Sequence, residues 1–289
     1  MTFLLSKNVR RQSTALVVSA LIIGATWSVA AHDFWLVPDA MAVGSAQEIV
    51  VRGQTSSAFP TSESAVAVNR ITDAKVIGAT GTETITARSI DGTSLLLRHR
   101  PGSPGQKVVG VALGWSHVKE TAESFRRYLV LEGAEDALKR FEQAGTLPTT
   151  DIVRRYAKYA KTVVEVGDGP RAFDRIAGHP LEFVPLTDPS ALRETTALRV
   201  RILFQRKPLA NARIHAGRAP VEGQPAGKDH ELMSSADGVV TIPAGAAGLW
   251  NIRTLHVVPA PAGADANWDV HWASFVWERS RSHRIGLHY

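Results

Sequence analysis

The sequence predicts a mostly β fold with a helical insertion, an α+β protein in which a mixed, β-rich N-terminal domain precedes a C-terminal β-sandwich. Three observations favour this class. Short runs of alternating apolar and polar residues, separated by turn residues, fill the chain after residue 190. Similar strand-like runs occur before residue 118. The segment between them instead repeats its apolar residues at helical spacing.

Residues 1–31 have the features of a cleavable signal peptide. Three basic residues precede position 12, an apolar run covers Ala15 to Ala25, and small residues end at Ala31. A membrane-spanning helix needs about 20 apolar residues, so this shorter run favours cleavage over retention as an anchor. Cleavage after Ala31 would make His32 the first residue of the mature chain. We therefore expect a periplasmic or secreted protein with no integral membrane segment after cleavage.

Residues 32–190 are predicted to form the N-terminal β-rich domain with a helical middle segment. Its strand-like runs cover 47–52, 84–88, 94–98 and 107–113. Between Val118 and Phe141 the apolar residues recur mostly at three- and four-residue steps, which predicts an amphipathic helix interrupted near Gly133. Residues 152–163 repeat this spacing and predict a further helical segment.

A turn-rich stretch at 187–190 marks the predicted domain boundary. Residues 191–278 then read as a small antiparallel sandwich, because short strand-like runs alternate with turns at 198–204, 212–215, 239–242, 249–258 and 268–278. Residues 279–289 are rich in Arg, Ser and His and predict a weakly attached tail.

Composition excludes several function classes. The chain has 33 Lys+Arg against 27 Asp+Glu; residues 1–31 hold three cations and no acids, so the mature part has 30 against 27, or +3. That charge is too small to predict a nucleic-acid partner. There is no cysteine, which excludes disulfides, thiolate metal sites and a cysteine nucleophile. Phosphate-binding glycine loops, a Gly-x-Ser-x-Gly elbow and a His-Glu-x-x-His pair are also absent from the sequence.

The ten histidines remain as candidate metal ligands, and all lie after residue 31. An N-terminal His32 would chelate a metal through its α-amino group and its ring together. Nitrogen ligands of this kind suit Cu(II) or Ni(II). The alternative is that cleavage exposes a histidine that has no partner nearby.

His256 and His271 lie on two successive predicted strands. Alternation places His256 on the face of Trp250, Ile252 and Val258, where a histidine is either neutral and hydrogen-bonded or bound to a ligand. The register between the strands is left open by the sequence: one register puts His271 on the other face, and a slip of one residue pairs the two histidines directly. His271 is therefore the weaker of these two candidates.

The chain resembles an uncharacterised exported domain family that is described as the periplasmic component of nickel or cobalt uptake systems. The resemblance rests on the order of stretches such as AHDFWLVPD, SFRRYLVLEGAEDALKRF, HPLEFVPLTDPSAL and GLWNIRTLHVVPA, up to about residue 278. It implies an immunoglobulin-like C-terminal sandwich and a role with transition metals. His32 and His256 match the family pattern, whereas His179 stands where a glycine is usual.

These arguments lead to one main hypothesis and two alternatives. The main hypothesis is an exported protein that binds Ni, Co or Cu through His32, His256 and the weaker candidate His271, and passes the metal ion to a membrane transporter component. One alternative is a copper enzyme that uses an N-terminal histidine chelate. The other is a metal-free structural or adhesive module of the cell envelope. The sequence favours a binding protein over an enzyme.

Overall fold

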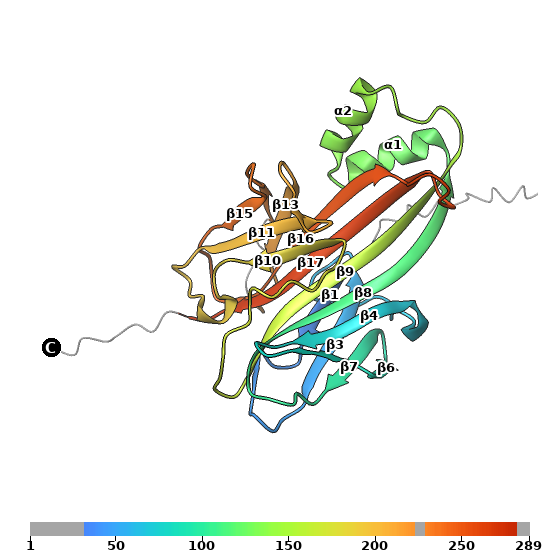
Figure 1. The fold of residues 1–289 in the computed structure, drawn as a ribbon. Helices are drawn as coiled ribbons and strands as arrows, with labels where there is room; N and C mark the ends of the chain where they lie inside the picture. Colours follow the sequence, from blue (N-terminus) through green and yellow to red (C-terminus); the bar gives the residue numbers. More distant parts are fainter. Residues whose placement is uncertain (1–31, 223–228, 282–289) are drawn as a thin grey trace, which may run out of the picture.

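The fold is built around one large, twisted β-sheet that carries a smaller sheet on each face (Figure 1). The computed structural model describes residues 32–222 and 229–281. The predicted signal peptide and most of the predicted tail therefore lie outside the described residues. Half-buried and fully buried strands dominate, and two helices close one end, which confirms the predicted mostly β, α+β class.

The large sheet has the strand order β14-β13-β16-β17-β9-β8-β4-β5, with the short β2 beside β9. Its two central strands, β17 and β9, run parallel. Consecutive residues of β8 and β9, several of them β-branched, are buried on both faces, as in strands covered from two sides. The strands are β2 (Ala42–Val43), β4 (Ile71–Ile77), β5 (Thr82–Thr84), β8 (Gly105–Glu120), β9 (Ile152–Val166), β13 (Arg213–Arg218), β14 (His230–Met233), β16 (Gly248–Pro259) and β17 (Trp268–Arg279).

Two four-stranded sheets cover the large sheet. One has the order β1-β3-β7-β6 and joins the core that contains Ala160 and Val164; the other pairs β11 with β10, β12 and β15 and joins the core that contains Tyr159 and Phe275. Because side chains alternate along a strand, these cores lie on opposite faces. The strands are β1 (Asp33–Pro38), β3 (Ile49–Ser56), β6 (Ala87–Asp91), β7 (Ser94–His99), β10 (Leu181–Pro185), β11 (Leu198–Phe204), β12 (Lys207–Pro208) and β15 (Val239–Ile242).

The predicted interrupted helix is present as α1 (Ala122–Leu131) and α2 (Glu135–Gln143). The Thr121 side chain caps α1 by accepting the backbone N–H of Ser124. Gly133 separates the helices with φ +72°, a conformation that other residues rarely adopt. Both helices pack on the β16–β17 end of the face that β1 also covers. Short 3₁₀ turns occur at Val68–Arg70 and Pro189–Ala191.

The helix predicted at 152–163 is wrong, since these residues form β9. Their apolar residues do recur at three- and four-residue steps. However, small and β-branched residues between them are buried on both faces, and neighbouring strands on both sides decide the conformation.

Strands from both sides of the predicted boundary at residue 190 share the large sheet. β9 precedes that boundary and β17 follows it, yet the two pair over nine residues. The division into 32–190 and 191–278 remains a prediction. In the described part of the chain no helix has the length and hydropathy needed to cross a bilayer.

Candidate functional site

The β16–β17 hairpin places His256 directly opposite His271. Pro259 pairs with Trp268 at its closed end, which is the shifted one of the two registers that the sequence leaves open. Residues directly opposite on antiparallel strands project from the same face with their Cβ atoms about 5 Å apart. The hairpin therefore presents two imidazoles side by side on the face that also carries Tyr159, called here the histidine face.

Aromatic rings enclose this histidine pair. The Phe204 ring at the end of β11 lies 4.4 Å from the His256 ring and 5.1 Å from the His271 ring, measured between centroids. Trp115 contacts the His271 ring edge-on at 5.2 Å. The Tyr159 hydroxyl lies 3.1 Å from Nδ1 of His271. No other hydrogen bond to His271 occurs among the described residues, so its Nε2 atom keeps its binding capacity.

Burial keeps both imidazoles neutral. Desolvation lowers the pKa of His256 to about 4, with smaller contributions from the nearby charge of Arg140 and from His271. Desolvation also lowers the pKa of His271 to about 4, although Asp269 opposes the shift. A neutral imidazole is the form that binds a transition metal. At neutral pH both side chains are therefore in the form that can offer a ring nitrogen to a ligand.

A cavity of about 650 Å³ opens beside His271. Aromatic rings and prolines form much of its wall, and a few polar groups converge on it. Such a combination is typical of small-ligand sites. The cavity is lined by Trp115, Gly178, His179, Pro180, Phe204, Gln205, Arg206, Val258, Pro259, Pro261, Asp269 and His271.

His179 forms part of this wall and is 3% exposed, whereas its position before a proline suggests an ordinary surface residue. Its ring lies 5.7 Å from that of Tyr159, and neither ring nitrogen has a hydrogen-bond partner within the described ranges. The Nε2 atom is 3.6 Å from the Asp73 carboxylate. Gly110 makes room for the imidazole, since a Cβ there would lie 3.2 Å from it.

A buried ion pair fixes the segment that carries His179. Glu182 and Lys161 are almost fully buried, and Glu182 accepts a 2.8 Å bond from the Lys161 ammonium. Glu182 also accepts the backbone N–H groups of Ala177 and Gly178. These charge-assisted bonds hold the backbone immediately before His179 against the large sheet.

His32 lies across the large sheet from the histidine pair. Its carbonyl accepts a hydrogen bond from Lys158, whose side chain projects from the opposite face to that of its neighbour Tyr159. The His32 ring contacts Glu63, with 2.8 Å between Nε2 and the carboxylate. The structure thus brings His256 and His271 together and places His32 apart from them.

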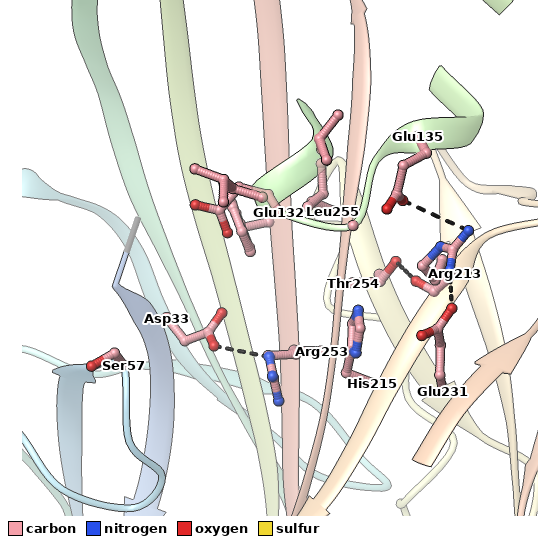
Figure 2. Close-up of a pocket in the computed structure, with 14 residues that line it drawn as sticks. Asp33, Ser57, Glu132, Glu135, Arg213, His215, Glu231, Arg253, Thr254 and Leu255 are labelled. Atoms are coloured by element: carbon pink, nitrogen blue, oxygen red, sulfur yellow. Dashed lines mark hydrogen bonds and ion pairs between the residues drawn. The ribbon is translucent and has the colours of Figure 1, made fainter. Parts of the chain in front are cut away.

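A second cavity, of about 380 Å³, lies near the start of β1 on the face opposite the histidine pair, called here the β1 face (Figure 2). Arg253 bridges Asp33 and Asp229 there, at 3.0 Å and 2.8 Å. Burial raises the pKa of Asp33 to about 6 and lowers that of Lys158 to about 8, and each of these charges opposes the shift of the other. His215 also faces this cavity (Figure 2), and burial lowers its pKa. Ion-paired side chains line this cavity, whereas aromatic rings and prolines form much of the wall beside His271.

Within the residues that the structure describes, no three His, Asp or Glu side chains are placed to hold one metal ion. The histidine pair offers two protein ligands, and four-coordinate sites need two more. Water, a small molecule or a partner protein would have to supply them.

The sequence misses the residues that enclose the histidine pair. Phe204, Tyr159 and Trp115 come from three strands far apart in the chain, and no local pattern connects them to His256. The one available signal is the pair of strands with a histidine each, where the correct register depends on a shift of a single residue.

The fold and site define a β-rich α+β protein with a histidine pair beside an aromatic cavity. By its sequence the chain belongs to the DUF4198 family, a domain of unknown function whose model matches residues 29–258. This confirms membership of an uncharacterised domain family. No curated protein matches the chain.

Solved structures resemble this chain only weakly. They include trypsin-activated alpha-2-macroglobulin from Escherichia coli, with 7% identity over 86% of this chain and 16% of that chain, at a TM-score of 0.24. The Yersinia pseudotuberculosis adhesin InvE shares 14% identity over 84% of this chain and 58% of its own, at a TM-score of 0.19. Murine CEACAM1b shares 9% identity over 87% of this chain and 100% of its own, at a TM-score of 0.20. The chain thus spans a small part of the alpha-2-macroglobulin that it matches, and TM-scores this low do not define a shared fold.

Proposed function

We propose that this protein is an exported transition-metal-binding protein that holds Ni(II), Co(II) or Cu(II) at the His256–His271 pair and passes the ion to a membrane partner. The observation that carries the proposal is the direct pairing of the two histidines across the β16–β17 hairpin. Imidazole nitrogen is a good ligand for all three ions, whereas calcium and magnesium prefer oxygen.

Two further features support a carrier over a permanently metallated protein. Two protein ligands leave coordination positions that a receiving protein can enter. The Phe204 and Trp115 rings that contact the pair are apolar, so they limit the access of water to the ion. Export remains part of the proposal, and it rests on the signal features of residues 1–31.

The test is metal titration of the protein by calorimetry with Ni(II), Co(II) and Cu(II). In protein with an extra residue before His32 we expect one ion per chain, with Cu(II) binding most tightly because of the general order of divalent affinities. Either His256→Ala or His271→Ala should weaken binding by more than about 100-fold, beyond the usual effect of outer-shell changes. His230→Ala, on the exposed edge strand β14, is the matched control and should bind normally.

Unchanged binding in both the His256→Ala and the His271→Ala variants would contradict the proposal. Absence of binding in the unmodified protein would instead favour the metal-free envelope module. Metal-dependent consumption of oxygen in the presence of a reductant would favour the copper enzyme.

The predicted chelate at His32 is a separate site under this proposal, because the large sheet lies between His32 and the pair. A protein that begins at His32 should bind a second ion through its α-amino group and ring. One extra residue before His32 should abolish that second event and leave the first unchanged. Mass spectrometry of the exported protein establishes where the natural chain is cut.

A further inference from the structure

We propose that the cavity beside His271 binds a small organic carboxylate that chelates the metal, so that the ion is carried as a ternary complex. This inference rests on the proposed function and names the molecule that completes its coordination. The ligand class is a compact chelator with at least one carboxylate in addition to the groups that hold the ion.

The need for a second chelator follows from the ligand count. The pair contributes two nitrogens, and no further His, Asp or Glu joins them in the described ranges. Asp269 lies in the cavity wall, but its carboxylate is already bound by two nitrogens of Arg155, at 2.7 Å and 3.1 Å. A bidentate molecule in the cavity would fill the remaining positions.

The charge of the bound molecule follows from Arg206 in the cavity wall. Among the described residues no carboxylate forms an ion pair with this arginine. Gln205 and Arg206 form the two-residue turn between β11 and β12, with φ of +49° and +65°. Such φ values are usual in a two-residue hairpin turn. Arg206 is exposed at this turn and lines the cavity, so its guanidinium is available to a bound anion. An anionic group, such as a carboxylate, would complement it.

His179 gives an independent indication of a polar ligand. It is buried in the wall of the same cavity, and its Nδ1 atom lacks a hydrogen-bond partner in the described structure, whereas its Nε2 atom lies 3.6 Å from the Asp73 carboxylate. Buried polar groups in folded proteins are nearly always hydrogen-bonded, so an unpartnered one calls for a partner. A carboxylate or hydroxyl oxygen of the bound molecule would supply it.

The remaining wall suits the carbon skeleton of such a molecule. Trp115, Phe204 and three prolines contribute apolar surface, and the volume of about 650 Å³ lies within the usual range for small-ligand sites. The cavity is large enough for a metal ion with one chelator of the size of citrate or histidine.

The experiment compares Ni(II) alone, citrate alone and the 1:1 nickel–citrate complex by calorimetry. We expect nickel–citrate to bind at least about tenfold more tightly than Ni(II) alone, because a charge-assisted hydrogen bond adds to the two nitrogen ligands. Arg206→Gln should remove that advantage and leave binding of Ni(II) alone unchanged. Arg201→Gln, an exposed arginine on the same β11 strand, is the matched control and should keep it. Histidine in place of citrate tests whether another carboxylate chelator acts in the same way.

The outcomes separate the two proposals. If Ni(II) alone binds as tightly as nickel–citrate and Arg206→Gln changes neither, the ternary complex is wrong while the metal site stands. If nickel–citrate binds as tightly to His271→Ala as to the unmodified protein, the cavity is an anion site without a link to the metal ligands, and the inference is overturned. If neither Ni(II) nor its complexes bind, the proposed function itself fails.

Discussion

The two faces of the large sheet bury titratable groups in opposite ways. On the histidine face, His256 and His271 are surrounded by aromatic rings, and desolvation keeps them neutral. On the β1 face, Asp33 and Lys158 are also buried, but Arg253 and further charges lie around them. The comparison shows that the same sheet keeps imidazoles neutral where desolvation outweighs the nearby charges, and holds an ion-pair network where charged side chains contact one another.

The first prediction concerns the exception on the histidine face, the enclosed Lys161–Glu182 pair. Glu182→Gln should lower the free energy of unfolding by about 3–5 kcal/mol, because it leaves the Lys161 ammonium buried without its counter-charge. Urea unfolding at pH 7 measures this. The control is Glu48→Gln in the exposed Arg98–Glu48 pair, which should cost less than about 1 kcal/mol. Equal costs would mean that the enclosed pair does not hold the His179 segment.

The second prediction concerns the pH dependence of the free energy of unfolding, because the buried titratable groups of the two faces contribute to it with opposite sign. Each histidine has a pKa of about 4 in the folded protein against 6.5 ordinarily, so between those values the unfolded chain binds more protons. The free energy of unfolding therefore falls as pH falls through this window. Asp33 has a raised pKa of about 6 against 3.8, so between those values the folded protein binds more protons, and its contribution falls as pH rises.

Variants separate these contributions in urea unfolding between pH 4 and pH 7. His271→Gln should reduce the acid loss of stability by roughly 2 kcal/mol, because the imidazole is buried and its pKa is lowered. Asp33→Asn should make the acid loss steeper, since it removes the opposing contribution. Parallel pH profiles for the two variants would contradict the difference between the faces.

The sequence predicts the element types better than their partners. Alternation identifies β11, β16 and β17, and helical spacing with Gly133 identifies the two helices, because these signals are local. A helix is wrongly predicted where β9 lies, because the sequence of β9 also fits a helical period. Burial on both faces decides its conformation. Its parallel pairing with β17 joins residues more than 100 positions apart, and no local sequence pattern can predict such a pairing.

The candidate site is predictable only in part for the same reason. His256 and His271 stand out in the sequence, but their contact depends on a register shift of one residue. Nothing in the sequence places His32 across the sheet from them, since that requires knowing which face β1 covers. The burial of His179 depends on Glu182 and Lys161, which interact across a loop and a sheet.

The smallest predicted effect tests whether the histidine face positions its ligand as well as desolvating it. If Tyr159 accepts the Nδ1 proton of His271, the Nε2 atom is free to bind metal, and Tyr159→Phe should weaken Ni(II) binding by about tenfold. The ring and its packing against His179 would remain, so unfolding should change little. The control is Tyr156→Phe on the same strand but on the opposite face, beside Arg70 and Lys158, which should not change binding. Calorimetry distinguishes the two, and an equal loss in both variants would show that the hydroxyl acts through general stability and not through His271.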